Sequence, residues 1–125
     1  MKKTILLGLL ILAVGLLAAC NAGEGDPVET VETYLDAKVK GDAGVISSLI
    51  CTDMESFIER ESRTFSSVSD VSLENMSCTF DGDSRVNCDG RIVALYGTEE
   101  VDFPLTSYRV IQEDGEWKWC GEAGP

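Results

Sequence analysis

Hydrophobic side chains follow three successive patterns along the chain. Residues 5–17 are almost continuously apolar, residues 28–65 repeat apolar positions at intervals of three and four, and residues 68–120 alternate apolar with polar positions. Intervals of three and four place side chains on one face of a helix, whereas alternation is typical of a half-buried strand. The pattern therefore predicts an apolar leader, then helices, then strands.

The helical region contains recognisable start and stop signals. Asp26 and Pro27 form an N-cap followed by a proline in the first turn, which predicts a helix start. Gly41 is expected to end this helix and Asp42 to cap a second, short one. A third helix is expected to begin at Thr52, through a capping box with the glutamate three residues later. Its outer face is predicted to carry the charged residues Glu59, Arg60, Glu61 and Arg63.

Four strands are expected in the second half of the chain. They cover residues 68–80, 86–95, 101–111 and 116–120. The alternation changes phase near Glu74 and Asn75, which predicts a β-bulge, and Pro104 indicates an edge position or another bulge in the third strand. Asp114-Gly115 is a strong hairpin signal. Helices followed by consecutive hairpins predict the α+β class with N-terminal helices packed against a four-stranded antiparallel sheet.

The leader carries the signature of an export signal. Lys2 and Lys3 precede the apolar run, which ends at Leu17-Ala18-Ala19-Cys20. This arrangement resembles the bacterial lipoprotein signal class, in which the cysteine is acylated and becomes the first residue of the mature chain. The resemblance implies a signal peptide (1–19), a lipidated Cys20 with a short tether (20–26) and a folded domain (27–125). It implies an extracytoplasmic protein held on a cell membrane or outer membrane by acyl chains on Cys20.

The charge of the mature chain excludes one class of partner. Once the signal is removed, eight basic and 22 acidic residues remain, a net charge of −14. Because so acidic a domain is repelled by phosphate groups, we expect it to bind neither nucleic acid nor anionic lipid head groups. Its attachment to a membrane would therefore depend on the lipid alone.

The four cysteines after Cys20 are expected to form two disulfides. In an exported domain an even number of cysteines indicates disulfides, and four allow three pairings. Cys78 and Cys88 flank a predicted hairpin turn, which favours pairing them with each other and Cys51 with Cys120. The chain has no histidine and no CxxC spacing, and its acidic clusters lack the EF-hand ligand pattern. We therefore expect no metal site and no cofactor.

Two segments resemble a known superfamily. The first helix, from Val28 to Ala37, with Lys40-Gly41-Asp42 after it, is similar to the first helix and turn of nuclear transport factor 2-like domains. The segment 112–120 is similar to their final hairpin. The resemblance covers residues 27–121. It implies a bent sheet around the first helix, forming a cone with a cavity at its wide end.

The cavity implied by this resemblance suggests candidate site residues. Tyr34, Tyr96 and Tyr108 are the candidates to face it, together with a carboxylate such as Asp36 or Asp102. Some members of the superfamily are isomerases or dehydratases that use cavity acids, tyrosines or histidines. This chain has no histidine to act as a base near neutral pH, and Asp102 alternates with apolar neighbours, which predicts that it faces outward.

Three functions remain open from the sequence. We expect a non-catalytic domain that binds a small apolar molecule in the cone or a protein on the sheet face, where a homodimer could also form. The alternatives are an isomerase- or dehydratase-like enzyme that uses a cavity carboxylate, and a structural accessory protein of the cell envelope. Trp117 and Trp119 lie two residues apart, so they share one face of the last strand. We expect them to lie in the core or partly in it, because tryptophan is mostly buried. The alternative is an exposed pair that binds a partner or stacks on a carbohydrate.

Replacing Cys20 tests the anchor. A Cys20→Ala variant should lose signal processing and membrane attachment while the domain still folds, because no other cysteine takes the lipid. Membrane fractionation and the mass of the mature protein report the two effects. Unchanged membrane fractionation of the variant would contradict the lipoprotein assignment.

Overall fold

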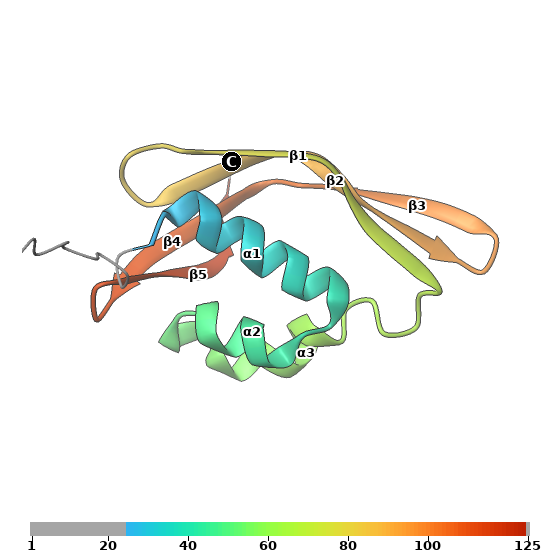
Figure 1. Cartoon of the computed structure of the whole chain (residues 1–125), viewed down its shortest axis with the longest axis horizontal. Coiled ribbons are helices and arrows are strands. Elements are labelled where there is room, and N and C mark those ends of the chain that lie inside the picture. The colour runs from blue at the N-terminus through green and yellow to red at the C-terminus, as the bar shows by residue number, and fades with distance from the viewer. Residues whose placement is uncertain (1–24, 125) are drawn as a thin grey trace, which may run out of the picture.

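The computed structural model describes residues 25–124, and Cys20 lies outside them. Helices come first and strands follow (Figure 1). The helical elements are α1 (Pro27–Lys40), α2 (Ala43–Leu49), a 3-10 helix (Thr52–Phe57) and α3 (Ile58–Ser62). The strands are β1 (Asp70–Phe80), β2 (Arg85–Tyr96), β3 (Glu99–Pro104), β4 (Ser107–Glu113) and β5 (Glu116–Glu122). Within residues 25–124 no helix is long and apolar enough to cross a membrane.

The helix α1 begins and ends as its sequence signals predict. The Asp26 carboxylate accepts a hydrogen bond from the Val28 N–H at 2.8 Å. Gly41 adopts a left-handed conformation with φ of 71° at the other end, which ends the helix. The helix α1 lies between the sheet on one side and α2 with α3 on the other (Figure 1). Its buried residues are Thr30, Val31, Tyr34, Leu35 and Ala37.

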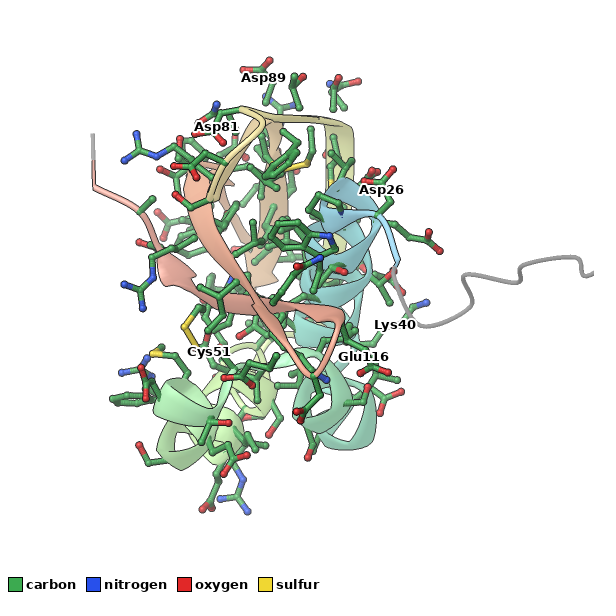
Figure 2. The ribbon with its side chains drawn as sticks, turned by 90° about the vertical axis from the view of Figure 1, so that its left-hand side faces the viewer. Asp26, Lys40, Cys51, Asp81, Asp89 and Glu116 are labelled. Atoms are coloured by element: carbon green, nitrogen blue, oxygen red, sulfur yellow. A yellow bond between two sulfur atoms is a disulfide. The ribbon has the colours of Figure 1, made fainter. Side chains whose placement is uncertain are left out.

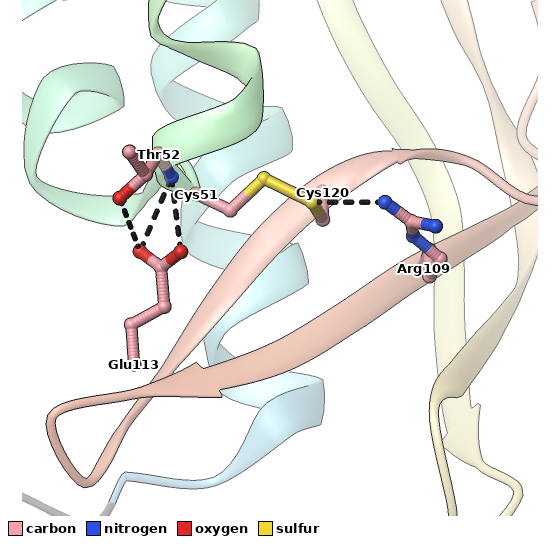
Figure 3. Close-up of a disulfide and its surroundings, with 5 residues drawn as sticks. All are labelled: Cys51, Thr52, Arg109, Glu113 and Cys120. Atoms are coloured by element: carbon pink, nitrogen blue, oxygen red, sulfur yellow. Dashed lines mark hydrogen bonds between the residues drawn. A yellow bond between two sulfur atoms is a disulfide. The ribbon is translucent and has the colours of Figure 1, made fainter.

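The prediction of a third helix that begins at Thr52 is only partly correct. Thr52 starts a 3-10 helix without a side-chain cap, and α3 itself covers only Ile58–Ser62. Instead of forming a capping box, Thr52 donates from its N–H and its hydroxyl to the Glu113 carboxylate at 3.1 to 3.2 Å (Figure 3). This contact attaches the start of the helical turn to the end of β4. The prediction failed because a tertiary partner competes for the donors that a capping box would use.

The sheet has five strands where the sequence predicted four. Its order is β1-β2-β4-β5, and β3 pairs with β2 beside β4. The segment expected as one strand from 101 to 111 is two: β3 ends at Pro104, which has no N–H to donate, and β4 begins at Ser107. Leu105 and Thr106 separate them, so the two strands take successive parts of the same edge of β2. The α+β class with an antiparallel sheet is confirmed.

The predicted bulge is present and lies at a close backbone approach. The register between β1 and β2 shifts between Glu74 and Ser77, and Asn75 has a φ of 55°. Across the strands lies Gly90, with φ of 109°, where a Cβ atom would come within 2.6 Å of the Asn75 carbonyl oxygen. Since bulges bend a strand and increase its twist, this position contributes to the curvature of the sheet over α1.

Both disulfides have the pairing that the sequence favoured. Cys78 and Cys88 lie directly opposite each other on β1 and β2, and the Cys51–Cys120 bridge joins the start of the 3-10 helix to β5 (Figure 3). The bridges span 10 and 69 residues, for which chain entropy gives about 3 and about 4 kcal/mol of stabilisation. Because disulfides persist in oxidising compartments, they indicate an extracytoplasmic domain.

Replacing Gly90 by alanine tests the bulge. We expect Gly90→Ala to lower the free energy of unfolding by about 1–3 kcal/mol more than Gly82→Ala does, because its methyl group would overlap the backbone of Asn75. Gly82 is a matched control: its φ of 91° is also positive, but nothing lies within 4 Å of the place that an added methyl group would take. Urea unfolding measures both variants, and equal losses would mean that the close approach is not a constraint.

Candidate functional site

A pocket of about 210 Å³ lies between the second half of α1 and the sheet. Six of the nine aromatic residues of the chain contribute to its wall. These aromatic residues are Tyr34, Phe65, Tyr96, Phe103, Tyr108 and Trp119. The other lining residues are Leu35, Lys38, Thr64, Ile92, Pro104, Leu105 and Glu122. The pocket is therefore aromatic and apolar, with few polar groups.

Several separate elements bring these side chains together. Tyr34 and Lys38 lie four residues apart, so they occupy the same face of α1. Ile92 and Tyr96 are on β2, in the part that β3 covers. The break after Pro104 places Leu105 between β3 and β4. The pocket therefore depends on the division of the predicted third strand into two.

The two innermost aromatic rings are stacked on each other. The ring centroids of Tyr34 and Trp119 are 3.9 Å apart with an interplanar angle of 11°, and both residues are buried. Nearer the surface, Phe65 meets Phe103 edge to face at 5.9 Å. The indole N–H of Trp119 is buried and has no hydrogen-bond partner among residues 25–124. This donor is the one buried polar side-chain atom of the described region without a partner.

A buried carboxylate lies directly behind the pocket. Glu61 is only 5% exposed, and its carboxylate accepts a hydrogen bond from the Tyr34 hydroxyl at 2.6 Å and from the Lys38 amino group at 3.4 Å. Burial, and then this hydrogen bond to Glu61, raise the pKa of Tyr34 well above its ordinary value of 10.0. Burial also raises the pKa of Tyr108. Both phenols are therefore neutral hydrogen-bonding groups at physiological pH.

The structure brings the three predicted tyrosines together, but not the predicted carboxylates. Tyr34, Tyr96 and Tyr108 all line the pocket. Asp36 instead pairs with a lysine on the exposed side of α1, and Asp102 pairs with an arginine of β2, facing outward as expected. The carboxylates near the pocket are Glu122, in its wall, and Glu61, behind Tyr34.

The expectation that Glu61 lies on the outer face of a helix is wrong. The change from a 3-10 to an α-helical turn at Ile58 alters which side chains face α1, and Glu61 points inward to Tyr34 and Lys38. No local pattern indicates this, because Glu61 lies in a run of charged residues. Trp119, in contrast, was expected to lie in the core and is buried, and Trp117 is partly buried.

Other hollows of the described surface are larger but less suited to a ligand. One of about 390 Å³ lies at the end of α1 and another of about 480 Å³ beside β5. Both are more open than the aromatic pocket and are lined mainly by charged, polar or glycine residues. Within residues 25–124 no group of three or more acidic, cysteine or histidine side chains is placed to hold a metal ion.

Removing the Tyr34 hydroxyl tests the buried hydrogen bond. Tyr34→Phe should lower the free energy of unfolding at pH 7 by about 1–3 kcal/mol, because the buried Glu61 carboxylate loses a donor. Tyr108→Phe is the control and should cost less, since its hydroxyl accepts only one long hydrogen bond, of 3.4 Å, from the Thr106 N–H. Urea unfolding at pH 7 gives both values, and equal costs would contradict this role of Tyr34.

The raised pKa of Tyr34 predicts that the free energy of unfolding decreases at alkaline pH. The raised pKa keeps Tyr34 protonated in the folded state, whereas the unfolded chain releases that proton near pH 10. The contribution to stability is therefore complete below pH 10 and decreases as the pH rises above it. Urea unfolding from pH 9 to 11 should show a steeper loss for the unaltered protein than for Tyr34→Phe. Parallel pH profiles would show that Tyr34 does not carry the effect.

Comparison with known proteins identifies the fold but no protein family and no function. A designed protein of the nuclear transport factor 2-like type has a similar structure, with a TM-score of 0.55 over 77% of this chain and 94% of that one. The two sequences are 14% identical, so the similarity concerns the fold alone. No protein-family model matches the chain, and neither does any curated protein. The domain therefore has the nuclear transport factor 2-like fold that the sequence resemblance implied.

Proposed function

We propose that this protein is a lipid-anchored, extracytoplasmic binding domain that holds a small, mainly apolar molecule in the aromatic pocket and performs no chemistry on it. The observation that carries the proposal is the concentration of aromatic residues around one partly open pocket. Ligand sites are typically concave, mostly apolar and supplied with a few polar groups that fix orientation. The hydroxyl of Tyr108 and the charge of Glu122 are such groups, whereas the Tyr34 hydroxyl and Lys38 already contact Glu61.

The volume of the pocket limits the size of its ligand. Sites for drug-sized molecules measure about 300–1,000 Å³, and this pocket, at about 210 Å³, is smaller. At about 30 Å³ for each water-sized group, it accommodates roughly seven non-hydrogen atoms. A short branched alkyl compound or a single ring has this size, whereas a steroid or a long acyl chain does not.

Exposed apolar side chains favour the pocket over the sheet face as the binding surface. Among residues 25–124 the large hydrophobic side chains that are exposed are Tyr96 and Phe103, and both belong to the pocket wall. A protein-docking surface would be expected to present a contiguous apolar patch. A homodimer through the sheet face therefore remains a secondary proposal, which light scattering of the purified protein tests.

The state of the buried carboxylate supports binding over catalysis. An isomerase-like mechanism needs a carboxylate that reaches the substrate. Glu61 does not line the pocket, and it already accepts hydrogen bonds from Tyr34 and Lys38. Glu122 does line the pocket but is exposed to solvent. Glu61 is therefore suited to a structural role, and Glu122 to the recognition of a ligand.

The anchor and the position of α1 are consistent with a receptor held near a membrane. The proposed tether, residues 20–26, reaches at most about 3.3–3.6 Å per residue and leads into the start of α1. The pocket lies along the second half of this helix. A helix of 14 residues is about 21 Å long, so the pocket would be held at a distance from the attachment point.

Titration with a small neutral compound tests the pocket. We propose neohexanol, which has seven non-hydrogen atoms, as the probe, followed by NMR of the two tryptophan indole N–H groups in the full chain. Trp119 lies in the pocket wall and Trp117 does not, so the Trp119 resonance should shift on binding while that of Trp117 serves as an internal control. Absence of any shift up to millimolar neohexanol would contradict the proposal.

A pair of bulky substitutions locates the bound probe. Thr64→Trp should abolish neohexanol binding, because Thr64 is exposed and lines the pocket. Ser66→Trp introduces the same side chain at an exposed position two residues away, outside this pocket wall, and should bind normally. Because each variant adds a third indole, calorimetry measures the affinities, and equal affinities would place the neohexanol site elsewhere.

A further inference from the structure

We infer that the ligand of the aromatic pocket is a small organic cation of the alkylammonium class. This inference rests on the proposed function, and it adds the charge and chemical class of the ligand. It follows from two independent observations: the aromatic composition of the wall, and the distribution of charged groups around it.

The aromatic wall provides favourable surroundings for a cation. The lining rings come from α1, from the segment after α3 and from four strands, so they border the space from several directions. The negative face of an aromatic ring attracts a cation within about 6 Å of its centre, and cages of such rings recognise quaternary ammonium groups. With only roughly seven non-hydrogen atoms of space, an ammonium group here is close to several rings wherever it lies.

The lysine in the pocket wall is already neutralised. The Lys38 amino group lies 3.4 Å from the Glu61 carboxylate, and both side chains are largely buried. Arg60 approaches the same carboxylate at 3.6 Å, but it is exposed, stacks over the Phe57 ring and does not line the pocket. The Lys38–Glu61 pair therefore contributes little net charge to the pocket.

Glu122 supplies the uncompensated charge. It lies on β5 in the pocket wall, is exposed, and forms no ion pair within residues 25–124. Arg109 borders the hollow on the other side of Glu122, but its guanidinium donates to the Cys120 sulfur at 3.3 Å. A ligand ammonium at the pocket mouth would be the partner of this carboxylate. The net charge of −14 that remains once the signal is removed adds a long-range attraction for cations.

Three probes of closely similar shape separate the effect of charge from that of volume. Choline and neohexanol are isosteres of seven non-hydrogen atoms with a positive and a zero charge. The tert-butylacetate anion (3,3-dimethylbutanoate) joins the same tert-butyl group to a carboxylate and has eight. Calorimetry with the full chain should give choline an affinity about tenfold higher than neohexanol, as expected from cation–π attraction in a partly desolvated site. Tert-butylacetate should bind more weakly than neohexanol.

A charge-matched pair of variants tests Glu122. Glu122→Gln should weaken choline binding by about threefold and leave neohexanol unchanged, the size expected of a partly solvated ion pair. Asp89→Asn removes one negative charge from an exposed position outside the pocket wall (labelled in Figure 2) and should alter neither affinity. An equal effect of both substitutions would mean that net charge, and not the position of Glu122, attracts the cation.

The outcomes separate this inference from the proposed function. If neohexanol binds as tightly as choline, or tert-butylacetate binds tightest, the inference of a cationic ligand is wrong. The proposal that the pocket binds a small molecule is then still supported. If none of the three compounds binds, the pocket itself is not a binding site and both proposals fail. Choline binding that Thr64→Trp leaves intact would also overturn the inference, because the cation would then lie outside the aromatic pocket.

Discussion

The side chain of Tyr34 joins three separate parts of the fold. Its ring projects from α1 and stacks on Trp119 of β5, while its hydroxyl donates to Glu61 of α3. Tyr34 is fully buried, so each contact forms in a medium where an unpaired polar group is costly. Tyr34 therefore connects the wall of the pocket to α3 and is one of the partners of the inward-pointing Glu61.

The Cys51–Cys120 disulfide stabilises the part of the fold that surrounds Tyr34. A chain of this size buries a small core, and its helical segment after α2 is short and irregular. The Cys51–Cys120 bridge holds the start of that segment to β5, next to a parallel bridge between Ile50 and Trp119. The disulfide thus fixes the strand that carries Trp119, and through it the floor of the pocket.

The shape of the sheet provides the space that the aromatic side chains surround. The bulge near Asn75 and the close approach at Gly90 bend β1 and β2, and the break after Pro104 lets β3 and β4 follow different parts of β2. Leu105 and Phe103 then reach the pocket from this corner. A binding role follows from the shape and lining of this space, and an ammonium ligand from the charges around it.

The sequence by itself determined the starts of α1 and α2, the alternation of the strands, the bulge and the disulfide pairing, because capping, side-chain period and hairpin geometry are local. It also indicated the three tyrosines of the pocket. Only the tertiary structure decided that Glu61 is buried, that Thr52 bonds to Glu113 and that residues 101–111 form two strands. The first two depend on a partner far away in the chain, whose hydrogen bonds outweigh the local preference. The third follows from Pro104, which interrupts the pairing, and from β2, which offers separate parts of one edge to β3 and β4. Glu122 likewise becomes part of a pocket only when α1 and β5 come together.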